Sequence, residues 1–208
     1  MSLEVTLARI AELQTVLAPK PAAPVDPAAF RGTLQSVQAG LPAGMVGGTA
    51  PPVPAALPVA GGTPAGQAIV NLVRGEVGQA EQPPGSNDSP RIAQYRQATA
   101  GSGVGAWCAY FTSWAAREAG VPLGDAGQGF GRVDDVYAWA QRAGKAIPAG
   151  GAAPQPGDLI VWDEHIGVVE SVLPDGRIQT IEGNSSDAVT RRVHDASGGG
   201  AIGYVRLG

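Results

Sequence analysis

The 208-residue chain has a single cysteine, Cys108, and only two histidines, His165 and His194. One cysteine excludes an internal disulfide bond and any metal site built from several thiolates. Charged residues make up only 15% of the chain, and no cluster of Lys and Arg provides the basic patch that nucleic-acid binding requires. No run of about 18 apolar residues is present, so the sequence predicts no transmembrane span.

The first residues, MSLEVTLARIAELQTVLAP, lack a basic start followed by an unbroken apolar core, which is the pattern of a secretory signal. Apolar residues at spacings of three and four instead predict an amphipathic helix over 2–18. A second short helix is expected over 27–38, with Asp26 as its N-cap. This helical segment, 1–39, needs a surface to cover its apolar stripes. That surface is its own hairpin, the later domain or a protein partner.

Glycine and proline are abundant, with 31 and 18 residues, and they concentrate in residues 40–64. The stretch GLPAGMVGGTAPPVPAALPVAGGTP has no hydrophobic period, which is typical of a Pro/Gly/Ala-rich linker. The sequence therefore predicts three parts, which are the helical segment 1–39, the linker 40–64 and a folded domain over 65–208.

The folded domain begins with helical patterns and ends with strand patterns. Helices are expected over 65–78, from Ser89 as a cap followed by Pro90, over 108–118 and over 132–144. Short stretches rich in Val and Ile predict strands within 158–163, 165–172, 177–183, 189–194 and 201–207. The sequence LPDG at 173–176 indicates a hairpin turn between two of them. Helices followed by consecutive strands predict an α+β domain with an antiparallel sheet.

Cys108 lies at the start of the helix predicted over 108–118. The first turn of a helix carries unpaired N–H groups and the positive end of the helix dipole, and both stabilise a thiolate. Glycines at 101, 103 and 105 leave the approach to the sulfur open. Two interpretations fit these observations, an activated nucleophile or a small buried apolar side chain, which is how most lone cysteines behave.

A thiolate nucleophile needs a proton partner, and that partner needs a group to orient it. His165 opens a predicted strand and could face the thiol, whereas His194 precedes a glycine run and is expected to be a surface histidine. Glu182 and Asn184 are two residues apart, so a regular strand would point both toward one face. Either side chain could then accept a hydrogen bond from an imidazole.

Four stretches in this order resemble the CHAP domain, the cysteine- and histidine-dependent amidohydrolase/peptidase family. They are WCAYFTSW at Cys108, PQPGDLIVW before His165, HIGVVESV at His165 and IEGNSS at Glu182, and GYVRL near the end is similar to the last strand of the family. The resemblance covers about residues 70–206. It implies a papain-like fold with helices packed on an antiparallel sheet.

The resemblance also implies roles for individual residues. Cys108 would be the nucleophile, His165 the base, Glu182 the residue that orients His165, and Asn184 would complete the group. Trp107 and Tyr110 beside the thiol are candidates to line a substrate groove, and Asn87 is a candidate substrate contact. The stretch RQATAGSGVGAW before Cys108 has no carboxylate, unlike the calcium loop of many phage-derived members, so we expect no calcium, no other metal and no cofactor.

Most members of the family cleave peptidoglycan, as N-acetylmuramoyl-L-alanine amidases or as peptide endopeptidases. We therefore expect a monomeric peptidoglycan hydrolase that is extracytoplasmic or associated with the cell wall, by a route not encoded as a standard signal peptide. Two alternatives stay open. One is an NlpC-type endopeptidase, which would usually carry a second histidine near Glu182. The other is a structural or adaptor component of a cell-surface assembly with a degenerate hydrolase domain.

Overall fold

The computed structural model describes residues 61–208. The helices predicted within 1–39 and nearly all of the predicted linker 40–64 lie outside the described residues. Both predictions, and the domain boundary placed at residue 65, therefore stay predictions.

Four helices precede most of the sheet: α3 (Pro64–Glu76), α4 (Pro90–Arg96), α5 (Cys108–Glu118) and α6 (Val133–Arg142). Side chains cap the first two, because the Thr63 and Ser89 hydroxyls accept hydrogen bonds from N–H groups of the first turn. A proline follows each cap, where its fixed φ suits a helix start. These local signals explain why α3 and α4 begin where the sequence predicts them, whereas α5 and α6 begin without a side-chain cap.

The strands are β1 (Ala146–Pro148), β2 (Leu159–Val161), β3 (Ile166–Val172), β4 (Ile178–Glu182), β5 (Thr190–His194) and β6 (Gly203–Val205). They form one antiparallel sheet in the order β1-β6-β2-β3-β4-β5. Five of these strands were predicted. The sequence analysis missed β1, which is only three residues long and includes a proline, a residue that sheets tolerate at an edge such as this one.

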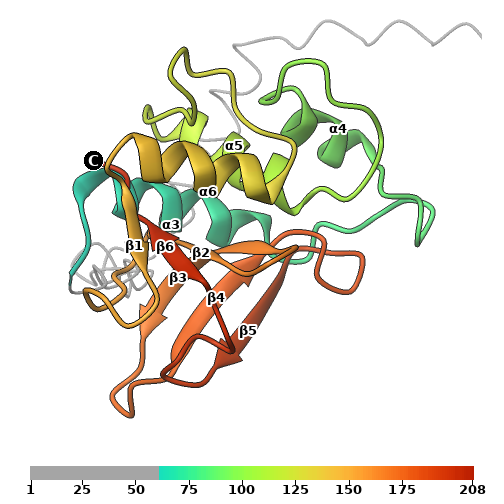
Figure 1. Cartoon of the computed structure of the whole chain (residues 1–208). Coiled ribbons are helices and arrows are strands. Elements are labelled where there is room, and N and C mark those ends of the chain that lie inside the picture. The colour runs from blue at the N-terminus through green and yellow to red at the C-terminus, as the bar shows by residue number, and fades with distance from the viewer. Residues whose placement is uncertain (1–60) are drawn as a thin grey trace, which may run out of the picture. The chain divides into compact units, whose positions relative to one another are not determined.

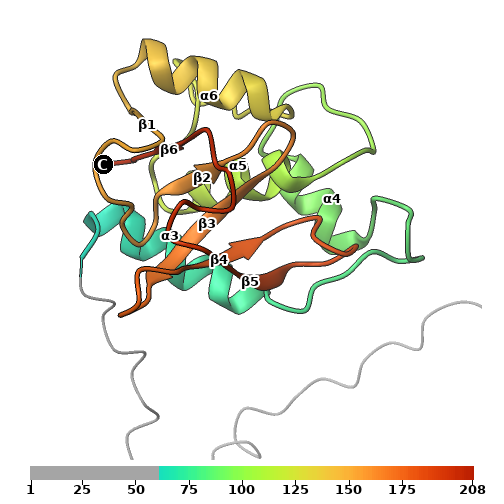
Figure 2. The same ribbon diagram turned by 60° about the horizontal axis from the view of Figure 1, so that its bottom comes forward.

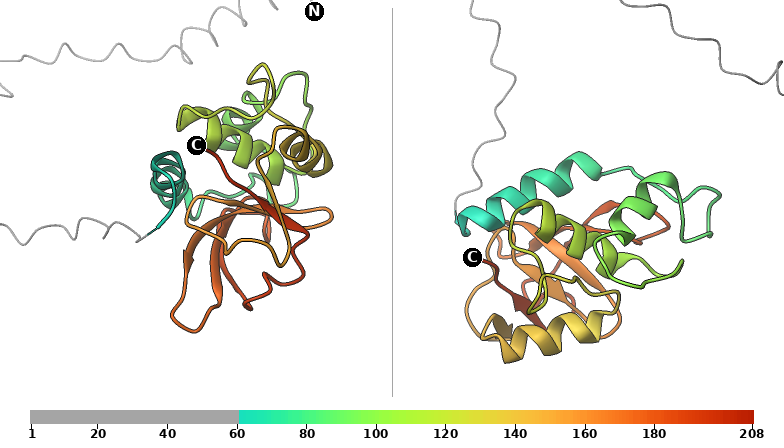
Figure 3. Two further views of the ribbon diagram at one scale, coloured as in Figure 1. Left: turned by 60° about the vertical axis from the view of Figure 1, so that its left-hand side comes forward. Right: turned by 90° about the horizontal axis from the view of Figure 1, so that it is seen from above.

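The helices and the sheet form two layers, so the predicted α+β class is confirmed (Figures 1 and 3). Helices α3 and α5 both pack on β3. Strand residues alternate between the two faces, so Val168 belongs to the core shared with the helices, whereas Val169 belongs to a smaller apolar cluster on the opposite face. Figure 2 brings the strands forward, with β4 and β5 side by side.

Helix α5 approaches the end of β4 very closely at Gly183. A Cβ atom at this position would lie 2.7 Å from the Phe111 Cβ and 2.9 Å from the Trp107 Cζ3. Only a residue without a side chain permits this contact. The glycine therefore determines how near the start of α5 comes to the strand end that carries Glu182.

None of the helices within residues 61–208 combines the length and the apolar character needed to cross a membrane.

Replacing Gly183 with alanine tests this close approach. The new methyl group would overlap the Phe111 and Trp107 side chains, so we expect Gly183→Ala to lower the free energy of unfolding by about 1–3 kcal/mol. Urea denaturation measures the loss. The matched control is Gly75→Ala in α3, where the added Cβ meets nothing within 4 Å, and it should cause no loss of stability. Equal stability of the two variants would contradict the packing described here.

Candidate active site

Cys108 is the first residue of α5, and its side chain is almost covered, with 5% of the residue exposed. The N-cap residue Trp107 makes no side-chain hydrogen bond to the helix, and the first turn contains no acidic residue. The N–H groups of this turn are therefore not capped by a side chain and point toward the region of the sulfur. Together with the helix dipole, they favour negative charge at this place.

The Trp107 ring is fully buried in the core, with 0% exposed, so the prediction that it lines a substrate groove is wrong. Its indole N–H donates to Glu81 Oε1 at 2.9 Å, and the backbone N–H of Asn87 donates to Glu81 Oε2 at 2.8 Å. Glu81 is itself buried. The sequence analysis missed this carboxylate, which ties the residue before the nucleophile to the loop at 81–88. The Asn87 side chain as a substrate contact stays a prediction.

Tyr110 is the third residue of α5 and is also nearly covered. Its hydroxyl donates to the Gly103 carbonyl at 3.0 Å, which fixes the loop in front of Cys108 against the helix. A Cβ atom on Gly131 would lie 2.9 Å from the Tyr110 Cε1, so the ring stands directly behind Gly131. Any contact of Tyr110 with a substrate stays a prediction.

His165 and Glu182 come together from neighbouring strands. In the register of β3 and β4, Val168 pairs with Ile181, which places Glu182 opposite Gly167, two residues from His165 on the same face. His165 Nε2 and Glu182 Oε2 are 2.9 Å apart and share a hydrogen bond. A Cβ atom on Gly167 would lie 2.6 Å from the Glu182 Cγ, so this glycine leaves the space through which the glutamate side chain reaches the ring.

The pKa values of His165 and Glu182 are shifted in opposite directions, and both shifts favour the charged forms. Burial lowers the pKa of His165, but hydrogen bonds to the Cys108 sulfur and to Glu182, with the negative charge of both groups, outweigh burial and raise this pKa to about 9. Burial raises the pKa of Glu182, but hydrogen bonds from His165, Thr180 and His194 outweigh it and lower this pKa to about 2. Because Glu182 holds Nε2 of the ring, Nδ1 is the nitrogen left for the sulfur.

These shifts have opposite consequences for the pH dependence of stability. The lowered pKa of Glu182 contributes stability above its ordinary value of 4.5, and this contribution is lost as the pH falls toward 2. The raised pKa of His165 contributes stability below its ordinary value of 6.5, and that contribution is lost as the pH rises through 9. At neutral pH, His165 is therefore protonated and Glu182 is ionised.

His194 does not lie freely on the surface, so that prediction is wrong. It is the last residue of β5, and 22% of its side chain is exposed. Its Nε2 lies 2.7 Å from Glu182 Oε1, the oxygen that also accepts a hydrogen bond from the Thr180 hydroxyl at 2.6 Å. The Trp162 ring packs against both imidazoles, with centroids 5.5 Å from His165 and 4.9 Å from His194. Both oxygens of the Glu182 carboxylate are thus occupied.

Asn184 is not presented as the strand pattern predicts. Strand β4 ends at Glu182, and Asn184 lies in the following turn with φ of 56°. The alternation of a regular strand stops before this residue, so the argument that placed it on the face of Glu182 is wrong. Within residues 61–208 its side chain has no hydrogen-bond partner. A role for Asn184 in catalysis stays a prediction.

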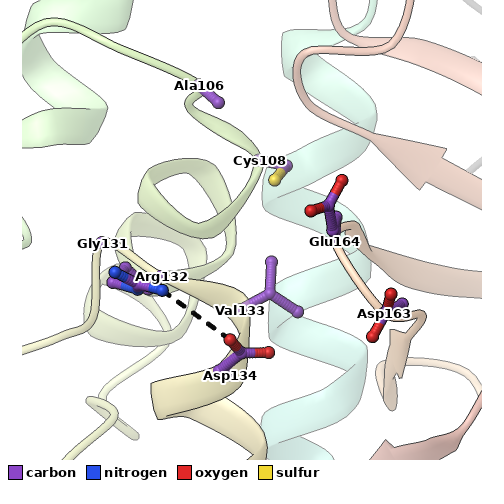
Figure 4. A pocket seen from close by; sticks show the side chains of 8 residues that line it. All are labelled: Ala106, Cys108, Gly131, Arg132, Val133, Asp134, Asp163 and Glu164. Atoms are coloured by element: carbon purple, nitrogen blue, oxygen red, sulfur yellow. Dashed lines mark ion pairs between the residues drawn. The ribbon is translucent and has the colours of Figure 1, made fainter.

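A cavity of about 310 Å³ opens beside the Cys108 sulfur (Figure 4). Its walls come from the residues before α5, from the start of α6 and from the turn that precedes His165. They are formed by Ala106, Cys108, Gly131, Arg132, Val133, Asp134, Asp163 and Glu164. The volume suits a small group of a larger substrate, and the cavity brings that group to the thiol.

No group of three or more His, Cys, Asp or Glu side chains within residues 61–208 is arranged to hold a metal ion. The side chains of Cys108, His165 and Glu182 provide a thiol, an imidazole and a carboxylate. This is the donor set of thiol-dependent acyl transfer.

Residues 99–184 match the family model of the CHAP domain. This stretch includes Cys108, His165, Glu182 and Asn184, so the resemblance drawn from the sequence motifs is confirmed. Comparison of the chain with curated proteins and with solved structures finds no match to either.

Replacing Glu182 with glutamine tests the electrostatic role of the carboxylate. The amide keeps the size of the side chain but removes the negative charge, so we expect the pKa of His165 to fall from about 9 toward its ordinary value of 6.5. NMR titration of the two imidazoles measures the change. Asp175→Asn, on the exposed hairpin between β3 and β4, should leave the titration unaltered. An unchanged midpoint in Glu182→Gln would show that the carboxylate does not set the charge of His165.

Proposed function

The chain carries a CHAP domain, and from that premise we propose that it is a cysteine-dependent amidase or peptidase that hydrolyses amide bonds of peptidoglycan. The observation that carries the proposal is the placement of His165, whose ring is held by a hydrogen bond to Glu182 and whose pKa is raised by the Cys108 sulfur and by Glu182. Neither the cysteine nor the histidine would need this arrangement in a domain that serves only as a scaffold.

The proposed reaction begins with attack of the Cys108 thiolate on an amide carbonyl carbon. The N–H groups in the first turn of α5 are suited to stabilise the resulting oxyanion, because no side chain caps them. The protonated His165 ring then donates its proton to the leaving amine, and the carbon–nitrogen bond breaks. The products of this half-reaction are a thioester on Cys108 and a free amine.

The second half-reaction returns the protein to its starting state. Neutral His165 accepts a proton from a water molecule, whose oxygen attacks the thioester carbonyl, and the carbon–sulfur bond breaks. A carboxylic acid leaves, and the thiolate–imidazolium pair forms again. Glu182 keeps its charge throughout, because its low pKa of about 2 lies far below neutral pH, and it stabilises the imidazolium each time the ring is protonated.

Peptidoglycan as the substrate rests on the family match, since CHAP domains mostly act on this polymer. The scissile bond is either the N-acetylmuramoyl-L-alanine amide or a peptide bond of the stem or cross-bridge. A third candidate is the bond next to D-glutamate, which NlpC-type endopeptidases cut. We expect the domain to act outside the cytoplasm, where the polymer lies.

Removal of the sulfur is the direct test of the proposed chemistry. We expect Cys108→Ala to abolish turbidity loss of purified cell walls, a decrease of at least about a thousandfold, because no other group replaces the nucleophile. Mass spectrometry of a defined muropeptide digest identifies the bond cut by the native chain. The control is Arg177→Gln on the exposed β3–β4 hairpin, which should keep full activity. Undiminished lysis by Cys108→Ala would exclude the mechanism, and an inactive native chain would favour an adaptor role.

The pH dependence of hydrolysis follows from His165. The ring must be protonated to release the amine, so kcat/KM should decrease at alkaline pH with a midpoint of about 9. Initial rates on a soluble muropeptide between neutral and alkaline pH measure this limb. A limb centred near 6.5, the ordinary pKa of histidine, would mean that Cys108 and Glu182 do not stabilise the imidazolium during turnover.

A further inference from the structure

The Glu182 carboxylate holds two imidazoles, and only one of them has a place in the proposed reaction. His165 occupies Oε2 and His194 occupies Oε1. His194 lies beyond residue 184, where the match to the CHAP family ends. The family resemblance therefore assigns it no role, and its position calls for an explanation from the structure.

The pairing of β4 with β5 brings His194 and Glu182 onto one face of the sheet. In the pairing of β4 with β5, His194 lies opposite Ile178 and Glu182 lies opposite Thr190, so the two side chains start from opposite ends of the paired segment. Both lie on the same face of the sheet, and His194 Nε2 comes within 2.7 Å of Glu182 Oε1. The Thr180 hydroxyl, between them on that face, donates to the same oxygen that His194 holds.

The His194 ring is also held from its other sides. The Trp162 ring packs against it, and the Trp162 indole N–H donates to the Gly198 carbonyl at 2.8 Å. A Cβ atom on Gly199 would lie 2.9 Å from the His194 Nδ1, so the loop after β5 closes directly over the ring. A histidine that merely faced solvent would not be enclosed in this way.

We infer that His194 is a positioning residue of the proposed active site, which fixes the Glu182 carboxylate in the orientation that His165 requires. This inference rests on the proposed function, since it concerns the same Cys108–His165–Glu182 group. The contact of His194 with Oε1 keeps the carboxylate from turning, so that Oε2 stays aligned with the His165 ring.

The charged groups around His194 leave Glu182 as its hydrogen-bonding partner. Glu182 faces it from β4, His165 contacts the same carboxylate from the residue before β3, and Asp195 follows it in the chain and interacts with it electrostatically. On β5 itself, Arg192 is directed to the Ser185 and Ser186 hydroxyls. The Glu182 carboxylate is thus the one group that both imidazoles contact.

Two substitutions separate the hydrogen bond from the packing of the ring. His194→Gln retains an N–H donor for Glu182 Oε1 but has no ring, whereas His194→Phe retains a ring against Trp162 but has no donor. The readout is the rate at which iodoacetamide alkylates Cys108 as a function of pH, with NMR titration of His165 in the same proteins. Val193→Ala, an exposed neighbour on β5, is the control, and thermal melting confirms that each variant is folded.

We expect the titration midpoint of His165 to stay close to native in His194→Gln, because the donor to Glu182 is retained, and to fall in His194→Phe. His194→Phe should lower the alkylation rate near neutral pH by about tenfold, the scale for loss of one orienting partner, while His194→Gln should stay close to native. A folded His194→Phe with native alkylation rates and a native His165 midpoint would overturn the inference.

The alkylation assay needs no peptidoglycan, so the inference and the proposed function can fail separately. Cell-wall lysis by the native chain, with alkylation that does not respond to His194, would overturn the inference alone. Alkylation that responds to His194 in a chain that cleaves no muropeptide would overturn the proposed function and support the positioning role.

Discussion

The site depends on a buried carboxylate, that of Glu182. A charge in this environment is costly unless it is paired and hydrogen-bonded, and here both oxygens are occupied, by Thr180 of β4, His194 of β5 and His165, the residue before β3. Burial lowers the pKa of His165, but the Cys108 sulfur and the negative charge of Glu182 together raise it to about 9, so His165 stays protonated at neutral pH. An imidazolium beside the start of α5, where the helix dipole also favours an anion, is the setting in which Cys108 can serve as a thiolate.

Two glycines make the approach of these groups possible. Gly167 leaves room for the Glu182 side chain on the face of the sheet, and Gly183 lets α5 descend onto the end of β4. Neither glycine has a reactive group, yet a methyl group at Gly167 would displace Glu182, and one at Gly183 would displace the start of α5. Glu81 contributes from a distance, because its hydrogen bond to the Trp107 indole fixes the residue that precedes the nucleophile.

Local signals in the sequence were enough for the four helices and for five of the six strands of residues 61–208, since apolar spacing, prolines and β-branched residues act within a few positions, but they did not predict β1. They also suggested that Cys108, His165 and Glu182 belong together. The positions of His194 and Asn184 were mispredicted, because the first depends on the register of β4 with β5 and the second on where β4 ends. The exposure of the Trp107 ring was mispredicted because the ring is held in the core by a hydrogen bond to Glu81, which is distant in the sequence.

The central claim is that Glu182 acts on Cys108 only through His165, and a double-mutant cycle on thiol alkylation tests it most directly. Iodoacetamide rates would be measured at one mildly acidic pH for the native chain, His165→Gln, Glu182→Gln and the double variant. The account predicts that each single substitution slows alkylation and that the Glu182 change has no further effect once His165 is gone. Independent, additive effects of the two substitutions would contradict it.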